Sequence, residues 1–251
     1  MTVYGFMFME NVDNATLDGL TPAAGEQTVF VTGDDMRVPS DANQLVMYHC
    51  VGGAITRALL TSPSLRSVCP LEILPIDDAV EPTSNFPPQK QLENPIQLTA
   101  GEALNANSTN SGAAATEQYV FVWLADSPVT PFTGGQIFHE LATGAITAVA
   151  DTWTNGALTL NDDLPAGRYA VVGFRAEGAT LIAARLIFVG QAFRPMVIGY
   201  DDEADIEDTI FRDGALGVLG EFEHDTPPRL EIMCEAADTT QQVILDIVKI
   251  S

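Results

Sequence analysis

Basic residues are scarce in this sequence, and their scarcity narrows the classes of partner that it can bind. Its 251 residues include 11 Lys and Arg against 34 Asp and Glu, and the formal net charge is -23. Proteins that hold a nucleic-acid backbone or an anionic membrane surface use clustered Lys and Arg, and the sequence has no such cluster. We therefore expect no direct binding of nucleic acid. The acidity fits plain solubility, a salty habitat or a need for cations.

Cysteine and long apolar runs are also lacking. Cys50, Cys69 and Cys234 are an odd number, and no C-x-x-C pair is present, which argues against a disulfide framework or a zinc site. We interpret them as small buried hydrophobic residues. No apolar run reaches the roughly 18 residues of a membrane helix. The first basic residue is Arg37, so the N-terminal stretch is interpreted as a strand and not as a signal peptide.

The motifs of common enzyme classes are missing as well. The sequence has no G-x-S-x-G nucleophile elbow and no G-x-x-x-x-G-K-[ST] phosphate loop. His49, His139 and His224 lie far apart, without the H-x-H or H-E-x-x-H spacing of a metal centre. His49 lies in an apolar run and is interpreted as a core residue. We predict that the protein is not an enzyme, and we assign no catalytic residue, cofactor or histidine-bound metal.

The sequence does contain many short apolar runs, rich in Val, Ile, Phe and Tyr. They alternate with clusters of Gly, Pro, Asn and Asp, which is typical of an all-β sandwich or barrel. The ranges that we predict as strands are 3–9, 28–32, 44–51, 71–76, 118–125, 135–140, 145–154, 157–160, 167–175, 181–188, 196–200, 218–223, 229–234 and 242–250.

A few local patterns predict the connections between the strands. In TWTNGALTL, residues 152–160, the Asn-Gly pair favours a type I′ hairpin turn. Residues 99–108, TAGEALNANS, predict a short helix, and residues 54–60 fit either a helix or a strand. Residues 105–116, NANSTNSGAAAT, are interpreted as a loop tip or a linker. No internal sequence repeat is evident, although two barrels can keep a common fold after their sequences have diverged.

Residues 164–188, LPAGRYAVVGFRAEGATLIAARLIF, predict two strands separated by a turn at 176–180. A half-buried strand alternates apolar and polar residues, but both faces of 181–188 are apolar except for Arg185. A strand that is apolar on both faces needs a covering layer on each side. That layer is either a second barrel of the same chain or a neighbouring copy. A mean hydropathy of +0.13, unusual in so acidic a chain, fits a protein that hides apolar surface in an assembly.

Four arginines lie in or beside apolar runs, and they are our candidates for a subunit interface. They are Arg168, Arg175, Arg185 and Arg194. A buried arginine is costly unless it is paired, carboxylate partners are abundant here, and arginine is enriched at interfaces. The alternative is an arginine that extends its charged end to water at the end of a strand.

The densest acidic run is YDDEADIEDTIFRD, residues 200–213. Its alternate carboxylates are our weak candidates for a cation site, and Ca2+ is the ion that such oxygen ligands suit. The run fails the EF-hand pattern because Ile206 stands where that loop needs glycine. A solvated loop is the alternative interpretation. The four carboxylates concerned are Asp201, Glu203, Asp205 and Glu207.

Four stretches together resemble major capsid proteins of small tailless icosahedral bacteriophages. They are RALLTSPSLRSVCPLEILPI (57–76), PIQLTAGEALNA (95–106), LPAGRYAVVGFRAEGATLIAARLIFVGQAFRP (164–195) and FRDGALGVLGEFE (211–223). The resemblance implies a jelly-roll fold, a double jelly roll with strands upright to the shell, and trimers that form pseudo-hexagonal capsomers. It carries over no catalytic residue. Because 251 residues are few for two eight-stranded barrels, either the barrels are compact or one barrel has long loops.

These observations predict a structural protein of a virion that assembles with itself into an icosahedral shell, made in the host cytoplasm. The fold class is all-β, with jelly-roll barrels at 1–125 and 126–251 and one or two short helices. Its partners are its own copies, as trimers, and other virion proteins. The genome is either held by other proteins or separated from this shell by a membrane. The alternatives are a phage spike or a carbohydrate- or receptor-binding β-sandwich, and, more remotely, a β-barrel enzyme.

Overall fold

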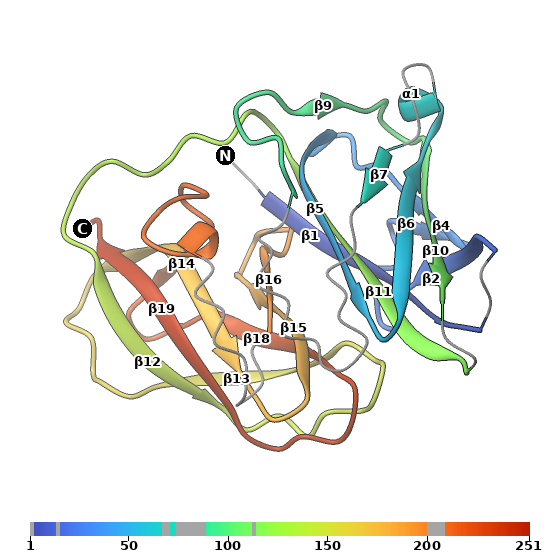
Figure 1. Cartoon of the computed structure of the whole chain (residues 1–251). Helices are drawn as coiled ribbons and strands as arrows, with labels where there is room; N and C mark the ends of the chain where they lie inside the picture. The colour runs from blue at the N-terminus through green and yellow to red at the C-terminus, as the bar shows by residue number, and fades with distance from the viewer. Residues whose placement is uncertain (1–2, 14–15, 67–70, 74–88, 112–113, 200–208) are drawn as a thin grey trace. The chain divides into compact units, whose positions relative to one another are not determined.

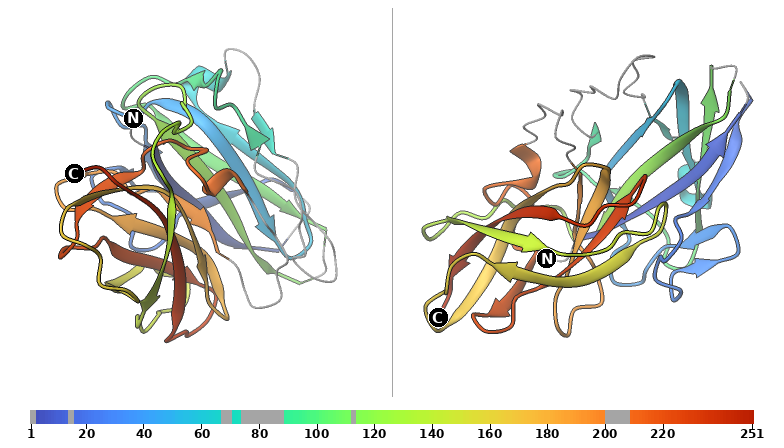
Figure 2. Two further views of the ribbon diagram at one scale, coloured as in Figure 1. Left: turned by 90° about the vertical axis from the view of Figure 1, so that its left-hand side faces the viewer. Right: turned by 90° about the horizontal axis from the view of Figure 1, so that it is seen from below.

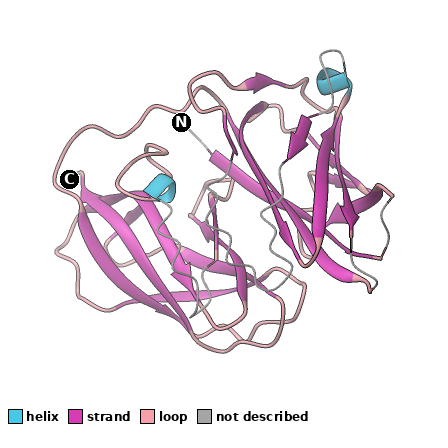
Figure 3. Cartoon of the chain, viewed as in Figure 1, coloured by secondary structure: helices cyan, strands magenta, loops and turns pink. Residues whose placement is uncertain are grey.

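The computed structural model describes residues 3–13, 16–66, 71–73, 89–111, 114–199 and 209–251. Within these ranges the chain is almost wholly strand and loop, as the colours of Figure 3 show. The helices there are one turn each, α1 (Pro63–Arg66) and η1 (Thr209–Phe211). The predicted all-β class is therefore confirmed. No helix in the described part of the chain has the length and apolar character needed to cross a membrane.

The chain packs as two compact units (Figure 1). The N-terminal unit is Phe6–Pro128, and the C-terminal unit is Val129–Ser251 together with Met1–Gly5. The division therefore runs through the first strand, β1 (Val3–Val12). One large antiparallel sheet is built from strands of residues 3–125 and another from strands of residues 138–249 (Figure 2).

The C-terminal unit is an eight-stranded jelly roll. Its strands pair first with last and so on inwards, as β12 with β19, β13 with β18, β14 with β17 and β15 with β16. That nested antiparallel pairing is the jelly-roll pattern. The strands are β12 (Phe138–Gly144), β13 (Thr154–Leu160), β14 (Arg168–Glu177), β15 (Leu181–Ile187), β16 (Met196–Ile198), β17 (Gly220–Glu223), β18 (Arg229–Cys234) and β19 (Gln241–Lys249).

The N-terminal unit repeats this topology. Its order across the sheet is β7-β6-β10-β2-β1-β11-β5-β8, which matches β16-β15-β18-β13-β12-β19-β14-β17 strand for strand. The additions are the β3–β4 hairpin on β10 and the short β9 on β5. The remaining bounds are β2 (Asp18–Pro22), β3 (Val31–Thr32), β4 (Asp35–Arg37), β5 (Gln44–Gly52), β6 (Ile55–Thr61), β7 (Leu71–Ile73), β8 (Gln89–Lys90), β9 (Ile96–Gln97), β10 (Ala103–Asn110) and β11 (Thr116–Ala125).

The protein is thus a double jelly roll, and of the two alternatives left open by its length the compact barrels are correct. Within the described residues the outer strands of the barrels are short, since β7, β8, β16 and β17 have two to four residues each. The long central strands supply the buried area. In β11, for example, the eight residues from Gln118 to Ala125 are all buried.

The predicted hairpin at Asn155-Gly156 is wrong. Both residues lie within β13, where they pair with Glu231 and Leu230 of β18. The next part of β13, Leu158–Leu160, pairs instead with β12. One strand therefore passes from one half of the jelly roll to the other, and its small Gly156 lies against the side chain of Ile146. The Asn-Gly pair serves this crossing and makes no turn.

Three further sequence predictions are corrected by strand pairing. The predicted helix at 99–108 is wrong because residues 103–110 form β10, which pairs with β2, β4 and β6. The same strand occupies the first half of the predicted loop or linker at 105–116. Residues 54–60, left open between helix and strand, belong mainly to β6. Of the predicted strand at 145–154, residues 145–153 form only isolated bridges, such as Val149 with Thr152, and Thr154 begins β13.

Candidate functional site

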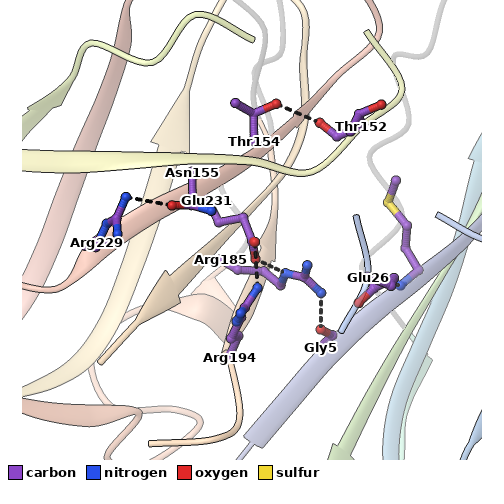
Figure 4. Close-up of polar contacts among 10 residues, drawn as sticks. Gly5, Glu26, Thr152, Thr154, Asn155, Arg185, Arg194, Arg229 and Glu231 are labelled. Atoms are coloured by element: carbon purple, nitrogen blue, oxygen red, sulfur yellow. Dashed lines mark hydrogen bonds and ion pairs between the residues drawn. The ribbon is translucent and has the colours of Figure 1, made fainter. Parts of the chain in front are cut away.

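A buried cluster of charges lies between β15 and β18 in the C-terminal unit (Figure 4). Arg185 and Glu231 are directly opposite each other in the strand register, and their side chains are 0% and 2% exposed. Glu231 Oε2 accepts a hydrogen bond from Arg185 Nε at 2.8 Å, and Oε1 accepts one from Arg194 Nη1 at 2.6 Å. Both carboxylate oxygens are therefore occupied by arginine, which compensates the desolvation of the charge.

The same cluster holds the first residues of the chain. Arg185 Nη1 donates to the carbonyl of Gly5 at 3.3 Å, and the Gly5 N–H donates to the carbonyl of Arg194 at 3.0 Å. A side chain at position 5 has no room, because its Cβ would lie 2.1 Å from the Cβ of Met196. The guanidinium of Arg185 also stacks on the ring of Trp153 at 3.7 Å, a favourable cation–π contact.

This arrangement explains the strand that is apolar on both faces. We expected the second face of 181–188 to be covered by another barrel or by another copy. At Arg185 the cover is instead made within the C-terminal unit, by Trp153, Gly5 and Arg194. The stretch therefore gives no evidence of an interface between copies at this point, and the charge in the middle of an apolar strand has partners of its own.

The four interface candidates are not gathered at one place. Arg185 has no exposed surface, and its ion pair is internal to the chain. Arg168, about half exposed, pairs with Glu221 of the neighbouring β17 at 2.6 Å, while Arg175 lies half-buried in β14 opposite Ile244. Arg168, Arg175 and Arg194 keep some exposed surface, and a subunit contact through them stays a prediction.

The acidic cation candidates, Asp201, Glu203, Asp205 and Glu207, lie outside the described residues. The same holds for Cys69. Cys50 and Cys234 are buried, as predicted. His49 is buried too, and it stacks on Phe121 with ring centroids 6.0 Å apart. Burial lowers the pKa of His49 to about 4, so this histidine is neutral in the fold near pH 7.

A second polar cluster, formed by His139, Asp213 and Asp246, was not found from the sequence. His139 of β12 is directly opposite Asp246 of β19 in the register, and its Nδ1 lies 2.7 Å from Asp246 Oδ1. The Asp246 side chain is 0% exposed, whereas half of the His139 side chain is exposed. Asp246 Oδ2 accepts a hydrogen bond from the Asp213 N–H at 2.7 Å. The ligand atoms of the three residues lie within 4.8 Å of one another.

Gly173 in β14 makes room for this cluster, and the turn after η1 lies over it. Gly173 is opposite Asp246, beside a β-bulge, and a Cβ there would lie 2.7 Å from Asp246 Oδ2 and 2.7 Å from the carbonyl oxygen of Phe211. The turn is held against β14 by a hydrogen bond, in which the Gly214 N–H donates to the Val172 carbonyl at 2.8 Å. Arg212 Nε lies 3.7 Å from Asp246 Oδ2. Close backbone approach at Gly173 thus buries Asp246 beneath the turn.

Comparisons with known proteins leave the chain without an assigned family. No family model matches it, and no curated protein matches it. Among solved structures it is similar to the crystal structure of the major capsid protein P2 from Bacteriophage PM2. The alignment has 12% sequence identity and a TM-score of 0.25, and it covers 100% of this chain and 97% of that one.

Proposed function

We propose that this protein is the major shell-forming protein of a small icosahedral bacteriophage. The observation that supports this best is the repeated strand order of the two units, two complete jelly rolls in one chain. Jelly rolls recur among viral capsid domains. A chain with two similar barrels lets three copies present six, so a trimer approximates a hexagon and can tile a closed surface. Such trimers, with their strands upright to the shell, are the building blocks of the proposed shell.

The sheet ends of this protein suit controlled assembly. In the described residues, the strands at the ends of both sheets are short, with two residues in β3 and in β8, three in β7 and in β16, and four in β17. Short edge strands oppose unplanned pairing of one sheet with another. In the proposal the copies therefore join through barrel sides and loops, and the sheets do not extend from copy to copy.

The strongly negative charge of the chain determines how the proposed shell relates to the genome. With a net charge of -23, the shell does not bind the genome directly. Other virion proteins or a membrane stand between this protein and the nucleic acid. The protein is made in the host cytoplasm and works in the virion, and it has no enzymatic role there.

A spike or carbohydrate-binding module is the rival function, since jelly rolls also occur in lectin domains. Sugar-binding modules use exposed aromatic rings. Phe138 is 48% exposed, but both tryptophans, Trp123 and Trp153, are buried at 0% and 5% exposed. Their burial favours the shell over the sugar-binding module.

The oligomeric state tests the proposal. The purified full chain is examined by multi-angle light scattering and by negative-stain electron microscopy, over a series of concentrations at physiological salt. We expect trimers of about 80 kDa, three times the 26.8 kDa chain, or larger capsomers and shells, since closed symmetric assembly needs self-complementary contacts. A monomer at every concentration that binds ligands on a glycan array would overturn the proposal in favour of the sugar-binding module.

A further inference from the structure

We propose that His139, Asp213 and Asp246 form a binding site for one divalent transition-metal ion, with zinc the best fit. The inference is independent of the shell function, because all three residues belong to the C-terminal unit of a single chain. The site joins β12, β19 and the turn after η1, three segments that lie far apart in the sequence.

The donor set selects the class of metal. One imidazole nitrogen with two carboxylate oxygens suits zinc, which takes three protein ligands and a water in open tetrahedral sites. Ca2+ instead prefers six to eight oxygen ligands, and this cluster offers a nitrogen and few oxygens. His139 and Asp213 are exposed and Asp246 is buried, so the fourth position faces solvent and is open to water.

The distances require only a small adjustment. Ligand atoms of a tetrahedral zinc site are about 3.4 Å apart, given bonds of about 2.1 Å. His139 Nδ1 and Asp246 Oδ1 are 2.7 Å apart, and all three ligand atoms lie within 4.8 Å. Since the His139 side chain is half exposed, a rotation of its ring opens the shorter distance. The exposed Asp213 carboxylate closes the longer ones in the same way.

Asp246 is held ready for the ion by its second oxygen. The Asp213 N–H donates to Asp246 Oδ2 at 2.7 Å, so Oδ1 remains directed at His139. Hydrogen bonds of this kind orient metal ligands and raise their affinity. The two carboxylates and Arg212, 3.7 Å from Asp246 Oδ2, give a net charge of -1 when His139 is neutral. Binding a divalent cation therefore leaves no large net charge of either sign in the buried half of the site.

The alternative is a histidine–aspartate ion pair that needs no metal. Both models keep His139 next to Asp246, but only the metal site needs the side chain of Asp213. The variant Asp213→Asn distinguishes the metal site from the metal-free ion pair, because it leaves the backbone N–H of residue 213 and the His139–Asp246 contact in place. It also sits on the surface, so the fold tolerates it.

The experiment uses the full chain after treatment with chelator and dialysis. Zinc chloride is titrated by isothermal calorimetry, and the shift in thermal unfolding is measured in parallel with zinc, calcium or magnesium. Cobalt(II) absorption gives a third readout that reports ligand geometry directly. The test variants are His139→Gln and Asp213→Asn. The matched controls are His224→Gln and Asp162→Asn, a half-buried histidine and an exposed aspartate elsewhere in the same unit.

We expect one zinc per chain, a rise in unfolding temperature with zinc that calcium and magnesium do not reproduce, and a tetrahedral cobalt spectrum. His139→Gln and Asp213→Asn should each weaken zinc binding by at least about tenfold, while the two controls bind as the parent does. No zinc binding, or zinc binding that survives both test variants, would overturn the site. Neither result bears on whether the chain assembles into shells.

Discussion

At the scale of single residues, the buried charges are the most informative feature of this protein. Arg185 lies in an apolar strand and has no exposed surface. Its charge is accommodated there by an ion pair with Glu231, a hydrogen bond to the Gly5 carbonyl and a cation–π contact with Trp153. Removing one member of a buried ion pair is far more damaging than removing an exposed one. Without Arg185, the buried Glu231 Oε2 loses its donor, and only Oε1 keeps its contact with Arg194. Exposed pairs such as Arg168 with Glu221 contribute little.

This contrast predicts unequal effects of two arginine substitutions. Arg185→Ala should lower the free energy of unfolding of the C-terminal unit by about 3 to 5 kcal/mol. Arg168→Ala, the matched control in the same unit, should lower it by less than about 1 kcal/mol. Urea unfolding followed by tryptophan fluorescence and circular dichroism measures both. Equal effects of the two variants would contradict the assignment of Arg185 as a buried structural pair.

The lowered pKa of His49 predicts that the fold loses stability in acid. Because the pKa of His49 is lowered from 6.5 to about 4 by burial, the unfolded chain binds more protons than the folded chain between these values. Stability therefore falls as the pH drops from about 6.5 to 4, by about 3 kcal/mol for the full shift. Urea midpoints of the N-terminal unit at pH 7 and pH 4.5 should differ less in His49→Gln than in the parent. His224→Gln should keep the parental difference, and a variant His49→Gln with unchanged acid sensitivity would refute the prediction.

At the scale of elements, the bulge in β14 determines how the turn after η1 meets the sheet. Gly173 lacks a side chain where the Phe211 carbonyl and the Arg212 Cα press against the strand. The bulge between Val171 and Gly173 shifts the register at this point. Bulges commonly bend a strand and redirect side chains, and here the bulge coincides with the burial of Asp246 under the turn.

Adding one methyl group at Gly173 should therefore disturb both the turn and the cluster beneath it. Gly173→Ala should lower the free energy of unfolding by about 1 to 3 kcal/mol, the usual cost of overpacking, and it should abolish the zinc-dependent rise in unfolding temperature. The control is Gly134→Ala, because a Cβ at position 134 has no neighbour within 4 Å. Calorimetric unfolding with and without zinc measures both effects, and parental behaviour of Gly173→Ala would show that the turn does not pack as described.

At the scale of the whole molecule, charge opposes the proposed assembly. Copies that each carry -23 repel one another unless the charges are paired or screened. Screening is effective beyond about 8 Å at physiological ionic strength, so salt and bound cations reduce the repulsion between neighbouring subunits.

We therefore expect salt or divalent cations to favour assembly of the purified chain. Light scattering during a titration with sodium chloride, and separately with calcium or magnesium chloride, should show faster growth of particles as ionic strength rises. A neutral osmolyte at matched osmolarity is the control. Faster assembly at low salt in the presence of a chelator would contradict the prediction.

Strand-forming segments of this protein could be predicted from local pattern alone. Runs such as 44–51, 118–125 and 229–234 carry enough apolar residues to be recognised as strands from the sequence, and they appear as β5, β11 and β18. The all-β class follows from the same residues. Hydrophobic content is a local property that a short window of sequence contains in full, which is why these predictions succeeded.

Strand pairing is not a local property, and it decided the rest. Residues 103–108 belong to β10, and Asn155-Gly156 belongs to β13, because both segments pair with strands far along the chain, against their own helix or turn tendencies. The bond between His139 and Asp246 joins residues 107 positions apart, and no spacing motif marks it. The apolar runs can be recognised in the sequence by itself. Which side chains meet across the sheets depends on strand register, and the register is set only when distant strands pair to close the two jelly rolls.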